Sequence, residues 1–189
     1  WQDFVRINIL EKVGMNETVP GFTLLHKKMN LATPHVRIQN NIIATDEFLQ
    51  QDIGEAGDPA GGISSNATDM AKWLLTELDS AKTPDQKRII PADSYKDLWK
   101  IIRPIDVPVL PAAIKPAQPD FYGYASGLRI SNYGSYKTVG HGGKLDGAVS
   151  HVLLVPGLKL GIAVFTNQES SGAYMSIIYR MLDHYMKRP

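Results

Sequence analysis

The residues of this chain whose types and spacing best suit chemistry are His141, Gly142 and Gly143, in the run from Val139 to Gly147. A glycine-rich turn at the end of a strand lets the backbone approach a ligand closely and direct N–H groups into a cleft. A histidine in such a turn can donate a hydrogen bond to a substrate group, or orient it, near neutral pH. The simpler alternative is a surface β-turn in which the histidine is incidental.

No recognised nucleophile pattern accompanies this turn. Ser64 begins like the serine of a Gly-x-Ser-x-Gly nucleophile elbow, but Asn66 stands where the closing glycine belongs. No serine is followed three residues later by a lysine. The 189 residues therefore lack a recognised activated nucleophile.

Phosphate, dinucleotide and metal patterns also fail. Gly143-Lys144 resembles the end of a phosphate-binding loop, but Leu145 occupies the position of the hydroxyl residue that would hold magnesium. Leu145 also occupies the sixth position of the dinucleotide fingerprint that would start at Gly140. No His-Glu-x-x-His occurs, and the five histidines are too dispersed for their spacing to define a metal site. We therefore expect no metal and no other cofactor.

Composition and charge are those of an ordinary globular protein. A chain of 189 residues that is 43% hydrophobic and 21% charged favours one domain with a real core. The net charge of +1 gives no electrostatic basis for binding nucleic acid or an acidic membrane surface. The absence of cysteine excludes disulfides, thiolate metal sites and thiol nucleophiles.

Neither a transmembrane segment nor a signal peptide is present in the sequence. No apolar stretch approaches the length needed to span a bilayer. The start at Trp1 lacks an initiator methionine and a basic region followed by an apolar one. We therefore expect the chain to begin inside a longer protein.

Apolar residues at offsets of three and four predict four helices, over 2–13, 66–79, 91–102 and 171–187. Gly14 is placed to end the first helix, Asn66 to cap the second, and Pro91 to begin the third. The predicted apolar positions are Phe4, Ile7, Leu10 and Val13; Ala67, Met70, Ala71, Leu74, Leu75 and Leu78; Tyr95, Leu98, Trp99 and Ile102; and Tyr174, Ile177, Ile178, Met181, Leu182 and Tyr185.

The remaining segments are predicted to be strands or loops. The region 15–60 is irregular, and the five prolines within 103–119 indicate a stiff extended loop. Strands are predicted over 122–131, 136–140, 148–155 and 160–166. Pro156 and Gly157 fit a type II turn between the last two strands.

Five segments resemble, in the same order, motifs of the serine β-lactamase-like superfamily. This superfamily includes class C β-lactamases, D-Ala-D-Ala carboxypeptidases, D-aminopeptidases and related esterases. The segments are Ile9 to Thr18 ("ePLGM-x-x-T"), Ala60 to Leu74 ("aGGl-x-ST-x-x-Dma-x-fL"), Tyr122 to Leu128 ("yGyG-x-Gw"), His141-Gly142-Gly143 (in place of Lys-Thr-Gly or His-x-Gly), and Val155-Pro156 with Ile162 to Asn167 ("P-x…vvvltN").

The resemblance implies an α+β fold, with an antiparallel sheet and helices on both of its faces. In the superfamily, a Ser-x-x-Lys helix and a Tyr-x-Asn motif precede the first of these segments. Residues 1–189 would then form a single partial domain, the C-terminal part of the fold, and would be inactive alone because the nucleophile lies upstream of Trp1. Tyr124-Ala125-Ser126 only mimics the tyrosine motif, because its place in the order is that of a strand.

The resemblance also assigns roles within this chain. His141 would orient the substrate and the proton network, and the backbone N–H of Lys144 would be the second oxyanion donor. The histidine replaces a lysine that meets the substrate carboxylate in true β-lactamases, so its weaker charge favours an ester, peptide or amide over a β-lactam. The substrate-binding residues implied are Gly142, Gly143, Tyr122 and Tyr124.

The leading hypothesis is therefore a serine hydrolase that acts through an acyl-enzyme on a small-molecule acyl substrate. The alternatives are a non-catalytic binding or regulatory module of the same fold, and an unrelated α+β binding domain. The N-terminal strands of the superfamily sheet would also lie upstream, so we expect an exposed sheet edge, an apolar cleft wall, and association with the missing N-terminal segment or a second copy. The superfamily alone suggests a periplasmic or extracellular location.

Overall fold

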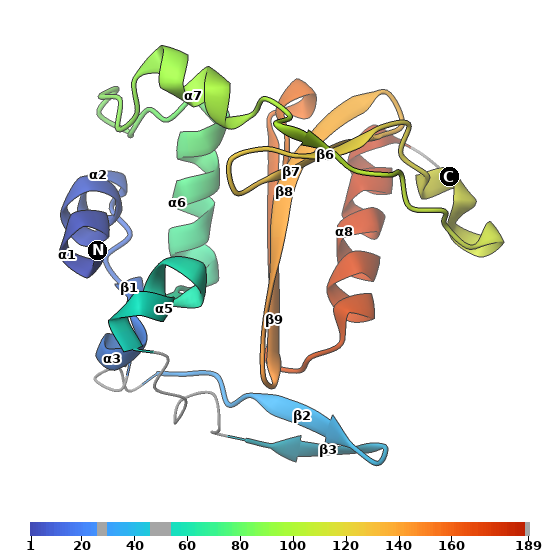
Figure 1. Ribbon diagram of the computed structural model, residues 1–189, viewed down its shortest axis with the longest axis horizontal. Helices are drawn as coiled ribbons and strands as arrows, with labels where there is room; N and C mark the ends of the chain where they lie inside the picture. Colours follow the sequence, from blue (N-terminus) through green and yellow to red (C-terminus); the bar gives the residue numbers. More distant parts are fainter. Residues whose placement is uncertain (26–29, 46–53, 188–189) are drawn as a thin grey trace.

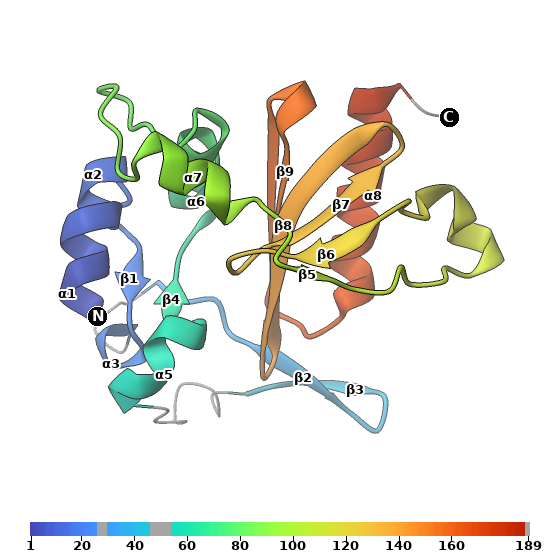
Figure 2. The ribbon, with the colours of Figure 1, turned by 45° about the horizontal axis from the view of Figure 1, so that its top comes forward.

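A computed structural model describes residues 1–25, 30–45 and 54–187 and has a six-stranded sheet at its centre (Figures 1 and 2). Neighbouring strands are antiparallel throughout, in the order β10-β9-β8-β7-β6-β5. The predicted α+β class with an antiparallel sheet is confirmed. The strands are β5 (Arg103–Pro104), β6 (Tyr122–Tyr124), β7 (Arg129–Tyr133), β8 (Tyr136–Leu145), β9 (Ala148–Val155) and β10 (Leu160–Thr166).

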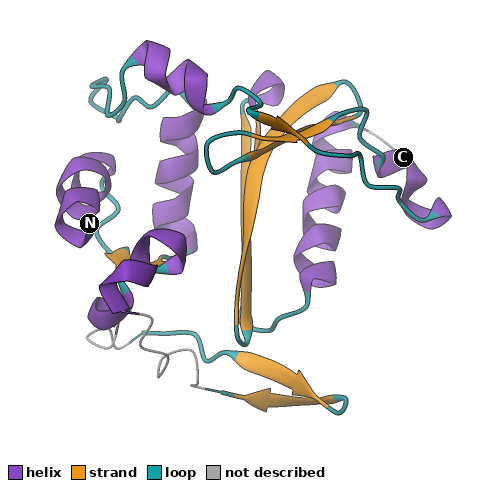
Figure 3. Cartoon of the chain, in the orientation of Figure 1, coloured by secondary structure: helices purple, strands orange, loops and turns teal. Residues whose placement is uncertain are grey.

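Two helices cover opposite faces of the long strands, α6 (Ala67–Leu78) on one side and α8 (Ser171–Met186) on the other (Figures 1 and 3). On its side, α8 buries Ile178 and Leu182 against the sheet. On the other face, Leu74 of α6 lies so close to Gly161 of β10 that an added Cβ would come within 2.9 Å of its Cβ. This glycine therefore allows α6 to pack directly on the edge strand.

The predicted N-terminal helix forms, but it contains a π-helical turn. It runs through α1 (Gln2–Val5), η1 (Arg6–Leu10) and α2 (Glu11–Val13) and ends at Gly14, whose φ of 80° is the left-handed cap expected. The wider turn places Val5, rather than Phe4, in line with Leu10 on the buried face. Phe4 is 66% exposed and Ile7 is exposed as well, so the predicted apolar stripe is wrong at both positions.

A buried carboxylate joins this helix to α6. Asp69 accepts hydrogen bonds from the Glu17 backbone N–H (2.8 Å) and the Thr18 hydroxyl (3.0 Å), and it pairs with Lys72 at 2.8 Å. Burial alone would raise the pKa of Asp69, but Lys72 and the two donors hold it below its usual value. The same lysine donates to the Gly14 carbonyl, so one ion pair fixes the end of the first helix.

The predicted capping of α6 is confirmed, but its buried face is not the one predicted. The Asn66 side chain accepts from the Asp69 N–H at 2.9 Å. Leu75 is 66% exposed, whereas Thr76 and Glu77 are buried beside Leu74. Tertiary contacts of the polar side chains therefore set the rotation of the helix, against its apolar periodicity. Of the other predicted apolar positions on this helix, Ala67 and Ala71 are also exposed.

The third and fourth predicted helices form with altered ends or faces. Helix α7 (Ala92–Leu98) stops before the predicted end, and Ile102 is exposed in the connection to β5. On α8, Ile177 and Tyr185 of the predicted core stripe are exposed as well. Within 103–119, the chain contains β5 and a 3-10 segment, η2 (Ala112–Ala117), where a continuous extended loop was predicted.

The region 15–60 was predicted to be irregular and instead holds several short elements. They are too short for hydrophobic periodicity to detect, and 26–29 and 46–53 lie outside the described residues. The elements are β1 (Val19–Pro20), which pairs with β4 (Ile63–Ser64); α3 (Phe22–Leu25); the hairpin of β2 (His35–Ile38) and β3 (Asn41–Ala44); and α5 (Gly54–Gly61). The hairpin forms a separate two-stranded sheet beside the turn between β8 and β9, where the His35 N–H donates to the Gly147 carbonyl at 3.0 Å (Figure 1).

Two predicted strand boundaries are wrong because turns were missed. The predicted strand 122–131 divides into β6 and β7 at a turn where Gly127 has a φ of 77°. The link between β9 and β10 is a 3-10 turn, η3 (Pro156–Leu158), followed by Lys159 at a φ of 50°. Lys159, not Gly157, therefore supplies the left-handed residue, so the turn is not type II. Within residues 1–25, 30–45 and 54–187, no helix combines the length and apolar character that crossing a bilayer requires.

Glu77 gives the fold a pH dependence that can be measured. Burial raises the pKa of its carboxyl to about 7, although a hydrogen bond from the Tyr95 hydroxyl opposes the rise. Between pH 4.5 and about 7, the carboxyl is therefore protonated in the folded state and ionised in the unfolded state. The free energy of unfolding should fall across this range by at most about 3 kcal/mol and level off above it.

The substitution Glu77→Gln should abolish this fall, because glutamine has no proton to release. The variant should match wild type near pH 4 and exceed its stability by about 1–3 kcal/mol at pH 8. Urea unfolding from pH 4 to 8 measures both, with the exposed Glu55→Gln as a control that keeps the wild-type slope. A flat profile in the wild-type chain would contradict the raised pKa.

Candidate active site

Strand β8 changes partner along its length, and among the described residues only Val139 and Gly140 are paired on both sides. β7 pairs with it from Tyr136 to Gly140, whereas β9 pairs with it from Val139 to Leu145. From His141 onward, the edge of β8 away from β9 has no strand partner among the residues described. His141, Gly142, Gly143 and Lys144 therefore lie on a half-open strand, and the expectation of a turn at His141 is wrong. The turn itself follows the end of β8, at Asp146 and Gly147.

The open edge arises because β7 begins only at Arg129, which pairs with Gly140. The residues before Arg129 form the turn from β6 into β7 and do not pair with β8. This turn is closed by a hydrogen bond from the Ala125 N–H to the Leu128 carbonyl, 2.8 Å long. β8 thus continues past the end of its neighbour.

The register also determines which backbone groups face the open edge. Successive residues of an antiparallel strand direct their N–H and C=O groups to opposite sides. The two-residue turn pairs Leu145 with Ala148, and this closing pair directs Leu145 toward β9. By alternation, Gly142 and Lys144 direct their N–H and C=O groups to the open edge. The Lys144 N–H, predicted as an oxyanion donor, therefore lies on the accessible side of the strand.

The side chains predicted to bind substrate lie together at the start of this edge. The His141 Nε2 and the Tyr124 hydroxyl share a hydrogen bond of 3.1 Å, and their rings meet edge to face with centroids 5.9 Å apart. Arg129, which sequence analysis missed, lies over the rings of Tyr122 and Tyr124 at 5.8 and 6.0 Å. Its guanidinium donates to the Tyr122 hydroxyl at 2.6 Å. Splitting the predicted strand at Gly127 would have placed Arg129 opposite Tyr124.

The Lys144 side chain points to a different partner. Its ammonium pairs with Glu169 at 3.3 Å, and both groups lie near the surface. The Glu169 carboxylate also accepts from the Arg37 backbone N–H at 3.3 Å, in strand β2 of the β2–β3 hairpin. The ammonium is therefore engaged in joining the end of β8 to the hairpin, while the backbone of Lys144 stays at the open edge.

A second histidine lies behind the motif, and no sequence pattern indicated it. His151 of β9 pairs with Gly142, and its ring stacks on Tyr174 with centroids 5.1 Å apart. Burial, and then the positive charges of His141 and Arg129, lower the pKa of His151 to about 4. It is therefore neutral at pH 7, and its buried Nδ1 has no hydrogen-bond partner among the residues that the structure describes.

The described residues supply neither a metal site nor an activated serine. No group of three or more histidine or acidic side chains gathers as metal ligands in the part of the chain that the structure describes. Among the hydrogen bonds of the same residues, none joins a serine hydroxyl to a lysine or histidine side chain. The open edge of β8 can hold an extended ligand and donate hydrogen bonds to it from backbone N–H groups.

The arrangement to be compared with known proteins is an antiparallel sheet between two helices, with a half-open strand that carries His141, Gly142 and Gly143. The sequence model of the Beta-lactamase family matches residues 1–185, and the chain belongs to this family. The sequence matches none of the curated proteins with which it was compared.

Solved structures show the same fold at low sequence identity. An octameric penicillin-binding protein homologue from Pyrococcus abyssi superposes with a TM-score of 0.77 at 20% identity, over 99% of this chain and 38% of that one. A class C β-lactamase from Rhodobacter sphaeroides gives 0.67 at 15% identity, over 98% and 54%. A D-stereospecific amidohydrolase from Streptomyces sp. gives 0.60 at 15%, over 88% and 43%. This chain thus spans about two-fifths to one-half of their lengths.

The glycines of β8 are unequal in what they tolerate, and this difference can be tested. An added Cβ at Gly140 would overlap the Val152 carbonyl oxygen, which is fixed backbone, whereas at Gly143 it would meet only the Ser150 hydroxyl at 2.8 Å. Gly140→Ala should lower the free energy of unfolding by about 1–3 kcal/mol. Gly143→Ala should stay within about 0.5 kcal/mol of wild type, because the serine can rotate away. Equal losses in urea titrations would contradict this account.

Proposed function

We propose that this chain is the C-terminal part of a serine hydrolase that acts through an acyl-enzyme on a small ester, peptide, amide or β-lactam. The observation that carries the proposal is the half-open β8, which presents backbone N–H groups beside His141 and Tyr124. Membership of the Beta-lactamase family supports the reaction class. The nucleophile would come from sequence upstream of Trp1.

The open edge would bind substrate as an additional strand. An extended acyl group beside β8 can pair with the backbone of Gly142 and Lys144, as peptides do when they extend a sheet. The Lys144 N–H would then donate to the oxyanion that forms when the nucleophile attacks the carbonyl. The second donor would be the N–H of the upstream serine.

His141 would act through its hydrogen bond with Tyr124. The imidazole and the phenol can exchange donor and acceptor roles, so the pair can orient a substrate group and pass a proton near neutral pH. Arg129, above the tyrosine rings, supplies the permanent positive charge that the histidine lacks. This arrangement favours esters and amides over β-lactams, whose carboxylate meets a lysine in true β-lactamases.

The competing proposal is a non-catalytic binding or regulatory module. Both proposals agree with the lack of any hydrogen bond from a serine hydroxyl to a lysine or histidine within the described residues, because only the region upstream of Trp1 discriminates between them. Sequencing the gene upstream of the Trp1 codon separates the two. A Ser-x-x-Lys on a predicted helix, followed by Tyr-x-Asn or Tyr-x-Ser, supports the hydrolase. An upstream region without those residues would leave the binding module.

His141→Ala in the complete protein should lower turnover by at least about tenfold, because a group that positions protons at the reaction centre is lost. The fold should be retained, since His141 is only partly buried. Ester and amide hydrolysis measure the effect, and far-UV circular dichroism checks the fold. His184→Ala, an exposed change near the end of α8, is the matched control. Unchanged turnover in His141→Ala would reduce His141 to a structural role.

The sheet edge should make this chain associate when it is isolated. β10 pairs only with β9 in the described sheet, and Phe165 on it is exposed. An unpaired, apolar edge strand favours pairing with another chain, here the missing N-terminal segment or a second copy. Sedimentation velocity at micromolar concentration should therefore detect species larger than one chain. A stable, monodisperse monomer would contradict this.

A further inference from the structure

A cavity of about 280 Å³ lies between the sheet and α8, on the face away from α6. Gly140 of β8 and His151 of β9 form part of its wall, so it lies directly behind the strand that carries the candidate active site. Pro108, Leu110 and Pro119 of the proline-rich segment cover it. The proposed hydrolase would share Tyr122 and Arg129 with this cavity and would not use the rest of it.

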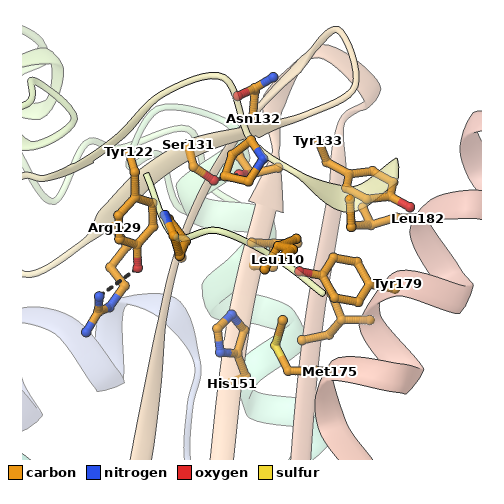
Figure 4. Close-up of a pocket in the computed structure, with 17 residues that line it drawn as sticks. Leu110, Tyr122, Arg129, Ser131, Asn132, Tyr133, His151, Met175, Tyr179 and Leu182 are labelled. Carbon is orange, nitrogen blue, oxygen red and sulfur yellow. Dashed lines mark hydrogen bonds between the residues drawn. The ribbon is translucent and has the colours of Figure 1, made fainter. Parts of the chain in front are cut away.

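One end of the cavity is apolar. Leu153 from the sheet meets Met175, Ile178, Tyr179 and Leu182 from α8 there. Figure 4 shows Tyr179 and Leu182 at this end and Leu110 near the middle. Burial of an alkyl chain among these groups is favourable by about 0.8 kcal/mol per methylene.

The opposite end is polar and positively charged. Arg129 and Tyr122 lie there, joined by their hydrogen bond (Figure 4). Across the described part of the chain, no carboxylate lies within 4.0 Å of the Arg129 guanidinium. His151 lines the same cavity, and its Nδ1 is unpartnered. The cavity thus has an exposed cation without a carboxylate partner in the described chain at one end of an apolar chamber.

We propose that this cavity binds a small monocarboxylate with an apolar tail, its carboxylate on Arg129 and its tail between the sheet and α8. A guanidinium forms strong, charge-assisted hydrogen bonds with a carboxylate. At about 30 Å³ for each water-sized group, the volume holds roughly nine such groups, which matches an alkanoate of about eight carbons.

Charge near the cavity favours an anion over a cation or a neutral ligand. Arg129 and His141 both lower the pKa of His151, so the potential at its ring is positive. A neutral His151 adds no second charge to the wall, so the ligand can bind without the cost of burying another ion. The site lies on the opposite side of β8 from the buried α6 face, and its occupation does not require the cleft to be catalytic.

A chain-length series of sodium alkanoates tests the tail. In isothermal titration of this chain, affinity should rise roughly fourfold per methylene from butanoate to octanoate and stop rising by dodecanoate. The ¹³C-methyl signal of Met175, in the cavity wall, should shift, whereas that of Met70, which packs on the N-terminal helix, should not. Affinity independent of length, or equal shifts at both methionines, would overturn the proposal.

The substitution Arg129→Met tests the head group. Octanoate should bind the variant about tenfold more weakly, whereas octan-1-ol, which has no charge, should bind wild type and variant alike. Arg180→Met, at an exposed position of α8 outside the cavity wall, should leave octanoate binding unchanged. Octanoate binding that survives Arg129→Met, or falls equally in Arg180→Met, would overturn the assignment.

Discussion

The uneven pairing of β8 is the constraint on which the rest of this structure depends. β7 holds the strand up to Gly140 and β9 holds it from Val139, so within the described sheet the residues from His141 onward are held by β9 alone. Backbone N–H and C=O groups that lack a strand partner must be satisfied by water or a ligand. The first half thus fixes the position of the strand, and the second half keeps groups available for recognition.

The surrounding elements keep the half-open strand rigid. β9 is supported in turn by β10, which packs closely on α6 through Gly161. The helix is then tied to the N-terminal segment by Asp69, whose buried carboxylate accepts from Glu17 and Thr18 and pairs with Lys72. A ligand at the open edge therefore meets a preorganised backbone, which lowers the entropic cost of binding.

The two faces of β8 have different chemistry because strand residues alternate in direction. His141 lies partly accessible beside Tyr124, whereas Gly142 leaves room behind it for the buried ring of His151. The glycines were interpreted from sequence as groups that admit a ligand. Gly140 instead admits the backbone of β9, and the open edge arises from the end of β7. The function of the His-Gly-Gly motif can therefore be interpreted only together with its neighbouring strands, β7 and β9.

Features set by local interactions could be predicted from the sequence: the α+β content, the Asn66 cap, the left-handed Gly14, and the order of segments typical of the family. Three features depended on the folded chain: the open edge, the exposure of Leu75, and the contact of Arg129 with the tyrosines. Caps and turns depend on residues a few positions apart, so their signals are local. Pairing register and helix rotation depend on contacts between distant segments, which a periodicity does not encode.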